Sequence, residues 1–163
     1  MERLILLRHG KAEANASSGN DFDRGLTERG QADSAIVALA LAQAGFSPDL
    51  VIVSPAARAR QTWEAMAYIF PGAEVVFAKT LYNAEPDVIL AEAESRGAEE
   101  PTVMVVAHNP GLHQLSLTLA FRLKDSPDRQ KLNAGFPTGA AAAFDLKGQR
   151  FSMFTPKALG GGA

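Results

Sequence analysis

An arginine and a histidine directly follow a short apolar run near the start of the chain. Residues 4–7 read LILL, which is typical of a buried strand, and Arg8, His9 and Gly10 come next. In open α/β sheets, ligands bind at the carboxyl ends of the strands. Arginine offers phosphate a planar fork of donors, and a neutral imidazole can act as a nucleophile. The pair is therefore a candidate phosphate site, with a positively charged turn as the alternative interpretation.

Two further segments repeat this placement. The run LVIV at residues 50–53 is followed by a proline that can open a helix, with Arg58 near its first turn. The run VMVV at residues 103–106 leads to His108, after which Asn109 can cap the next helix. Parallel strands that end on one edge would bring four side chains together: Arg8, His9, Arg58 and His108. Nearby helix N-termini would favour an anion there.

These segments resemble the histidine phosphatase superfamily. The Arg-His-Gly motif of that family matches residues 8–10, its Ser-Pro-x-x-Arg-x-x-Gln-Thr motif matches residues 54–62, and its second histidine matches His108. Residues 23–30 (DRGLTERG) and the short chain resemble the SixA-type phosphohistidine phosphatase branch. The resemblance runs from about residue 3 to residue 146, and its motifs are ordered and specific.

The resemblance implies a catalytic role for each of the four side chains. His9 would attack phosphorus and form a phosphoenzyme that water then hydrolyses. Arg8 and Arg58 would bind the phosphoryl oxygens, and His108 would stabilise charge near the leaving group. The attacking nitrogen of His9 must be unprotonated, which in this family is achieved by a backbone carbonyl that accepts a hydrogen bond from the other ring nitrogen. Here that carbonyl is expected near Gly10.

The general acid is less clearly marked. Many members of the family carry a glutamate after the third strand, which protonates an alkoxide leaving group. Glu85 is the candidate here, but a solvated or helix-capping glutamate is the competing interpretation, and Tyr82 is a weaker candidate. The imidazole of phosphohistidine, with a pKa of about 6.5, leaves far more easily than an alkoxide. A site with a weak acid therefore suits phosphohistidine.

Three functions follow from these residues. The first is a phosphatase acting on phosphohistidine in a partner protein of the histidine-phosphotransfer type. The alternative is a phosphomonoesterase for small metabolites. The third is a phosphate-binding module without turnover, which is disfavoured because His9 and both arginines are present.

Composition agrees with a small enzyme. The 163 residues include 47% hydrophobic and 21% charged residues, and the net charge of −2 gives no general attraction to nucleic acid. The apolar stretch at residues 4–7 is too short for a membrane span, so we expect a cytoplasmic protein. The chain has no cysteine and only three histidines, without a carboxylate cluster, so neither a metal nor another cofactor is predicted. The oligomeric state is left open.

Alternating apolar runs and helical patterns predict an α/β fold, a three-layer α/β/α sandwich with a mostly parallel sheet. Residues 140–146 and 150–155 read as a hairpin, so at least one strand should run antiparallel. Thr27 is expected to cap the first helix. A single domain is predicted for residues 1–157, followed by a flexible tail over residues 158–163.

Overall fold

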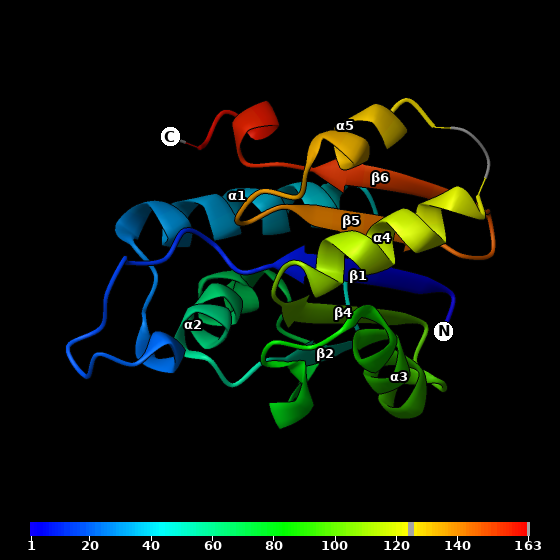
Figure 1. Ribbon diagram of the computed structural model, residues 1–163. Helices are drawn as coiled ribbons and strands as arrows, with labels where there is room; N and C mark the ends of the chain where they lie inside the picture. The colour runs from blue at the N-terminus through cyan, green and yellow to red at the C-terminus, as the bar shows by residue number, and fades with distance from the viewer. Residues whose placement is uncertain (124–125, 163) are drawn as a thin grey trace.

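A six-stranded sheet with the strand order β3-β2-β4-β1-β5-β6 forms the middle layer of the molecule (Figure 1). The computed structural model describes residues 1–123 and 126–162. The strands are β1 (Arg3–Arg8), β2 (Leu50–Val53), β3 (Glu74–Phe77), β4 (Thr102–Ala107), β5 (Ala141–Asp145) and β6 (Arg150–Phe154). Strands β3, β2, β4 and β1 are parallel, whereas β5 pairs antiparallel with both β1 and β6. The predicted mostly parallel sheet with an antiparallel hairpin is confirmed.

Helices cover both faces of this sheet (Figure 1). They are α1 (Glu28–Gln43), α2 (Ala57–Met66), α3 (Pro86–Gly97), α4 (Gly111–Phe121) and α5 (Arg129–Ala134), with short 3₁₀ turns η1 (Asp21–Asp23), η2 (Ala67–Ile69), η3 (Lys79–Leu81) and η4 (Lys157–Leu159). Alternate residues of β1 face two separate cores: Leu4 and Leu6 pack with α3, α4 and α5, and Ile5 and Leu7 pack with α1 and α2. The three-layer sandwich is therefore confirmed. No helix in the described part of the chain is long and apolar enough to cross a membrane.

The register of the parallel strands aligns their carboxyl ends. Leu7 of β1 and Val53 of β2 both lie opposite Val106 of β4. The residues that directly follow these three strands therefore emerge at one edge of the sheet, as the sequence pattern predicts.

Two predicted helix starts differ from the structure. Thr27 caps α1 as expected, since its hydroxyl accepts a hydrogen bond from the Gly30 N–H at 2.9 Å. The prediction that Asn109 caps α4 is wrong, because its side-chain amide donates to the Phe136 carbonyl at 2.8 Å instead. Helix α2 begins at Ala57, two residues after the proline expected to open it. Asn109 therefore binds the segment around Phe136, a long-range contact that the local sequence does not reveal.

The end of the chain lies against α1. Residues 157–159 form the turn η4, and the Gly162 N–H donates to the Asp33 carboxylate of α1 at 3.1 Å. The flexible tail that the sequence predicts over residues 158–163 stays a prediction. The domain boundary at residue 157 stays a prediction.

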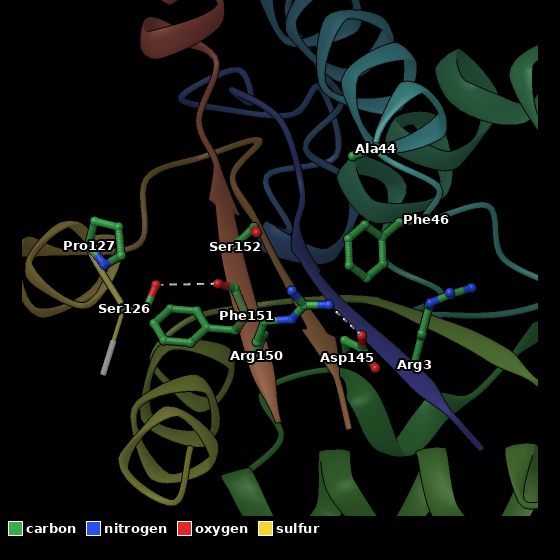
Figure 2. Close-up of a pocket in the computed structure, with 9 residues that line it drawn as sticks. All are labelled: Arg3, Ala44, Phe46, Ser126, Pro127, Asp145, Arg150, Phe151 and Ser152. Carbon is green, nitrogen blue, oxygen red and sulfur yellow. Dashed lines mark hydrogen bonds and ion pairs between the residues drawn. The ribbon is translucent and has the colours of Figure 1, made fainter. Parts of the chain in front are cut away.

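A cavity of about 410 Å³ lies at the opposite end of the sheet from the residues that follow β1 (Figure 2). It is lined by Arg3 at the start of β1 and by the ends of β5 and β6 that lie beside it. Two of its charged groups are paired across the hairpin, with the Arg150 guanidinium 3.8 Å from the Asp145 carboxylate. None of the four predicted site residues lines this cavity.

The first turn of α1 packs backbone against backbone on the loop that follows β1. A Cβ atom added at Gly30 would lie 2.3 Å from the carbonyl oxygen of Lys11, and one added at Gly10 would lie 2.7 Å from the carbonyl oxygen of Gly30. These distances are far below a van der Waals contact, so only glycine fits at both positions. The segment that carries His9 is thereby held directly on the helix.

We expect Gly30→Ala to destabilise the protein. Helix propensity alone would favour alanine by about 1 kcal/mol. The clash with the Lys11 carbonyl should reverse the sign and lower the free energy of unfolding by about 1–3 kcal/mol. Urea unfolding measures the change, with Gly72→Ala as the matched control because nothing lies within 4 Å of the added atom there. An unchanged or raised stability of Gly30→Ala would show that this contact is not tight.

Candidate active site

His9 is the first residue after β1 and is buried, with 6% of its surface exposed. Its Nδ1 lies 2.8 Å from the Gly10 carbonyl oxygen, which is the hydrogen bond predicted for it. A carbonyl only accepts, so the proton of a neutral His9 lies on Nδ1 and the lone pair lies on Nε2. The ring is therefore held in the tautomer that a nucleophile requires.

Arg58 directs its guanidinium at the unprotonated nitrogen. It is buried in the first turn of α2, and its Nε donates to His9 Nε2 at 3.3 Å. Its Nη1 donates to the Asp21 carbonyl at 2.9 Å and its Nη2 to the Asp21 carboxylate at 3.0 Å. The arginine thus presents donors at the point where His9 can attack.

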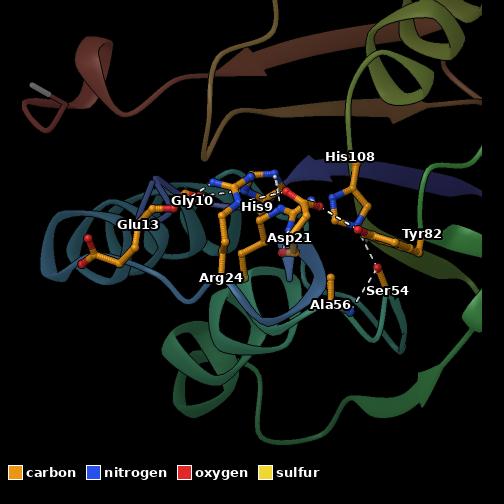
Figure 3. A network of polar contacts seen from close by, with 10 residues as sticks. His9, Gly10, Glu13, Asp21, Arg24, Ser54, Ala56, Tyr82 and His108 are labelled. Carbon is orange, nitrogen blue, oxygen red and sulfur yellow. Dashed lines mark hydrogen bonds and ion pairs between the residues drawn. The ribbon is translucent and has the colours of Figure 1, made fainter. Parts of the chain in front are cut away.

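His108 follows β4 and faces His9, with the ring centroids 5.2 Å apart. Its Nε2 lies 2.7 Å from the Ser54 hydroxyl, which also accepts a hydrogen bond from the Ala56 N–H at 3.4 Å (Figure 3). The hydroxyl proton can then be donated to Nε2, which leaves the His108 proton on Nδ1. This Nδ1 is buried and has no partner within residues 1–123 and 126–162. In this tautomer, the Nδ1–H is an unpaired donor among the described residues.

Burial keeps both histidines neutral. The pKa of His9 is lowered to about 4, mainly by desolvation and additionally by the positive charges of Arg58 and Arg8, while the Gly10 hydrogen bond opposes the shift. Desolvation is also the largest cause that lowers the pKa of His108 to about 3, with His9 and Arg58 adding to it. At neutral pH, the positive charge of the site therefore comes from its arginines.

Arg8 ends β1 and is partly buried. Its Nη1 donates to the Phe136 carbonyl at 3.0 Å, whereas its Nε is buried and has no partner in the described parts of the chain. Burial, together with the charge of Arg58, lowers the pKa of Arg8. Two neighbouring arginines with inward donors are expected to bind an anion strongly, because an anion would relieve their mutual repulsion.

A loop across residues 13–25 brings the Asp21 carboxylate to the site (Figure 3). The Asp21 carboxylate accepts hydrogen bonds from Arg58, from Arg24 Nε at 2.9 Å and from the Tyr82 hydroxyl at 2.6 Å. The Tyr82 bond, followed by the two arginines, holds the pKa of Asp21 well below its ordinary value. The same bond raises the pKa of Tyr82. From the sequence, Asp21 could line the cleft, but a turn-forming side chain was the preferred interpretation, so local sequence did not single it out.

The motif at residues 54–62 also has structural roles that its spacing did not disclose. The Gln61 side chain accepts from the Leu26 N–H at 2.7 Å at the base of the loop. Thr62 Oγ1 accepts from the Gly10 N–H at 2.9 Å and donates to the Arg58 carbonyl at 2.7 Å. Helix α2 therefore positions the loop that ends near Leu26, the turn at Gly10 and the Arg58 side chain.

Glu85 lies outside this arrangement. Its side chain is exposed at the N-cap position of α3, makes no capping hydrogen bond and has no contact with the network around His9. Tyr82, the weaker candidate, is the one that reaches the site, where its ring lies edge-on to His108 with centroids 5.6 Å apart. The role of Glu85 as a general acid stays a prediction.

The structure thus brings His9, Arg8, Arg58 and His108 to one edge of the sheet. A neutral nucleophilic nitrogen faces a guanidinium, and two further buried donors lie beside it, which is a geometry suited to phosphoryl transfer. In the part of the chain that the structure describes, no group of three His, Cys, Asp or Glu side chains is placed to hold a metal ion.

Comparisons with known proteins agree with this geometry. Residues 4–83 match the model of the histidine phosphatase superfamily, branch 1. A protein assigned as the phosphohistidine phosphatase SixA of Agrobacterium tumefaciens has 35% identity and a TM-score of 0.78, over 94% of this chain and 95% of that one. A similarly assigned structure from Nakamurella multipartitia has 29% identity and a TM-score of 0.77, over 94% and 93% of the two chains.

A relative by sequence is an uncharacterized chloroplastic protein of Arabidopsis thaliana, which is 34% identical over 128 residues. The match covers 72% of this chain and 59% of that protein, so this chain spans less than two thirds of the relative. Fold and site define the class as a phosphatase enzyme. The chain belongs to the histidine phosphatase superfamily, in its SixA-type branch.

We expect the two histidines to make stability depend on pH. An unfolded histidine titrates near pH 6.5, and His9 and His108 titrate near 4 and 3 when folded, so the unfolded chain binds more protons between these values. The free energy of unfolding should therefore fall on acidification below pH 6.5, by at most about 1.4 kcal/mol per pH unit for each histidine. Urea unfolding of wild type and His108→Asn tests this: the variant should show the shallower slope. Equal slopes would contradict the buried neutral histidine.

We expect Asp21 to compete with phosphate for Arg58. Replacing it by asparagine removes a negative charge but keeps an acceptor, so inorganic phosphate should bind about twofold to fivefold more tightly to Asp21→Asn, as is usual for an exposed charge. Isothermal titration calorimetry measures the affinity. Asp23→Asn is the matched control, because that carboxylate lies in the same loop and accepts only from Ser18. Weaker phosphate binding by Asp21→Asn would instead make Asp21 a positioning residue for Arg58.

Proposed function

We propose that this protein hydrolyses phosphohistidine on a partner protein through a phosphorylated His9. The observation that carries the proposal is the state of His9: its Nδ1 is bound to the Gly10 carbonyl, and its Nε2 faces the Arg58 guanidinium at 3.3 Å. A nitrogen with this lone pair and this neighbour is prepared to attack an anionic phosphoryl group.

In the first step, His9 Nε2 forms a bond to phosphorus while the bond between phosphorus and the substrate's imidazole nitrogen breaks. The substrate ring carries a proton on its other nitrogen, so it leaves as neutral imidazole with that electron pair. Arg8 and Arg58 bind the equatorial oxygens, which carry most of the charge in a loose phosphoryl-transfer transition state. The Nδ1–H of His108 supplies a further donor to the transferred group.

In the second step, water attacks the phosphorus of phospho-His9. The bond from phosphorus to Nε2 breaks, Nε2 recovers its lone pair, and inorganic phosphate carries away the oxygen of the water. The hydrogen bond from Nδ1 to Gly10 is kept throughout, so the ring returns to the same tautomer. The same donors serve both steps.

The leaving group distinguishes phosphohistidine from an ordinary phosphate ester. An alkoxide must be protonated as it leaves, but the Asp21 carboxylate is held in its ionised form and Glu85 is exposed away from the network. Imidazole, with a pKa of about 6.5, leaves with much less help. The assignment of the 35% identical Agrobacterium structure supports the same substrate. A histidine-phosphotransfer type of partner and a cytoplasmic location belong to this proposal.

The alternative is hydrolysis of small phosphate monoesters, and one observation favours it. Tyr82 carries a hydroxyl beside His108 and Asp21, close to where a leaving group would depart. However, its pKa is raised by the Asp21 hydrogen bond, which makes it a poorer proton donor. The observed geometry therefore supports phosphohistidine better.

The test compares hydrolysis of a phosphohistidine-bearing peptide with hydrolysis of sugar phosphates, whose alkoxide leaving groups need a general acid. We expect kcat/KM to favour phosphohistidine by about 100-fold or more, since each missing acid contribution is worth about 10²-fold to 10⁴-fold for esters. His9→Asn should remove activity by at least about 10³-fold, whereas Glu85→Gln should leave phosphohistidine hydrolysis within about twofold of wild type.

Two results would overturn the proposal. Faster monoester turnover that depends on Glu85 or Tyr82 would establish the small-metabolite phosphatase. Phosphate binding without turnover of either substrate class would establish the non-catalytic module.

A further inference from the structure

A groove of about 910 Å³ adjoins the site and shares Arg8 with it. One wall comes from the end of α5 and the segment after it, including Phe136, and another from η4 at the end of the chain. Asn109, which directly follows His108, also lines the groove. The groove therefore begins beside His9 and His108 and extends away from the position of the phosphoryl group. The proposed mechanism does not use the groove itself.

The wall segment is bonded directly to the catalytic residues. The Phe136 carbonyl accepts hydrogen bonds from Arg8 Nη1 at 3.0 Å and from the Asn109 amide at 2.8 Å. Three residues later, the Gly139 N–H donates to the His9 carbonyl at 2.8 Å. A molecule bound in the groove would therefore rest on the same backbone that orients Arg8, so its position relative to His9 would be fixed.

The charge of the groove has one sign. Its lining includes Arg8, Lys131 and Lys157 but no aspartate or glutamate, although the whole chain has a net charge of −2. Lys157 is exposed and makes no ion pair with any residue the structure describes. Lys131 is 3.4 Å from the Asp128 carboxylate in an exposed pair, which is weak in water. The groove is therefore complementary to a negatively charged ligand.

The walls between these cations are apolar. Phe136 is buried, and Ala134, Pro137 and Ala158 are exposed to solvent along the groove. Sites for small ligands usually bury about 70–90% of the ligand's surface, which requires a largely enclosed pocket. An open groove with exposed apolar and cationic side chains is better matched to a segment on the surface of a folded partner.

We propose that this groove docks an acidic and apolar segment of the partner protein, next to its phosphohistidine. Carboxylates of the segment pair with Lys131 and Lys157, its apolar side chains contact Ala134 and Pro137, and its phosphohistidine reaches His9 beside Arg8. This inference rests on the proposed function and names the surface feature by which the substrate is chosen. Charge complementarity of this kind raises association rates and excludes partners of the wrong sign.

The experiment uses two synthetic peptides of equal length, each with one phosphohistidine. In one peptide the flanking residues are Glu and Leu, and in the other Gln replaces each Glu. Phosphoramidate, which has a phosphorus–nitrogen bond but no flanking residues, reports the chemistry alone. The variants are Lys157→Glu, Lys157→Arg, and Ala158→Trp, which fills the groove without changing its charge. Lys147→Glu is the matched control, because Lys147 is exposed in the β5–β6 turn at the opposite end of the sheet.

We expect wild type to prefer the acidic peptide by about tenfold in kcat/KM at low ionic strength, and the preference to shrink as salt screens the charges. Lys157→Glu and Ala158→Trp should raise KM for the acidic peptide without changing kcat on phosphoramidate. Lys157→Arg and Lys147→Glu should behave as wild type. The unchanged phosphoramidate rate shows that the variants are folded and that His9 is intact.

Binding of the unphosphorylated acidic peptide, followed by fluorescence anisotropy, separates this inference from the proposed function. Charge-dependent binding that Lys157→Glu removes supports the groove even if no phosphohistidine is hydrolysed, in which case only the proposed function fails. The docking role of the groove is overturned if both phosphopeptides are hydrolysed at equal rates and neither Lys157→Glu nor Ala158→Trp has an effect. The proposed function would then still stand. Equal binding of both unphosphorylated peptides also overturns it.

Discussion

The hydrogen bond between His9 Nδ1 and the Gly10 carbonyl is the interaction on which the site depends. It determines which ring nitrogen carries the proton, and therefore which nitrogen can attack. The geometry of that carbonyl is in turn set by the packing of Gly10 on Gly30 and by the Gly10 N–H donated to Thr62. The fold thus contributes to the chemistry by holding one short turn between α1 and α2.

Around this turn, the structure concentrates positive charge while removing water. The two histidines are neutral because burial disfavours their charged forms, whereas Arg8 and Arg58 keep their charge. Without a ligand, the Asp21 carboxylate partly neutralises Arg58 from an exposed loop. A phosphoryl group would carry more charge than this carboxylate and would interact with Arg8 as well, so we expect it to displace Asp21 from Arg58.

The segment after α5 connects the chemistry to the surface. Through its carbonyl, Phe136 holds Arg8 and Asn109, and the same residue forms the wall of the basic groove. Catalytic residues and the groove therefore share one backbone support. The proposed phosphoprotein substrate would be recognised by this adjacent surface, which lies directly beside Arg8.

The sequence by itself determined the α/β layers, the antiparallel hairpin and the convergence of His9, Arg58 and His108. Alternating apolar runs and strand-end motifs are local patterns, so they can be recognised without knowing how distant segments pack. It did not determine that Asn109 would bind the Phe136 carbonyl instead of capping α4, that Asp21 would reach Arg58, or that Glu85 would point into solvent. Those outcomes depend on which distant segments meet, and an exposed polar residue looks the same in a sequence whether it caps, pairs or is solvated.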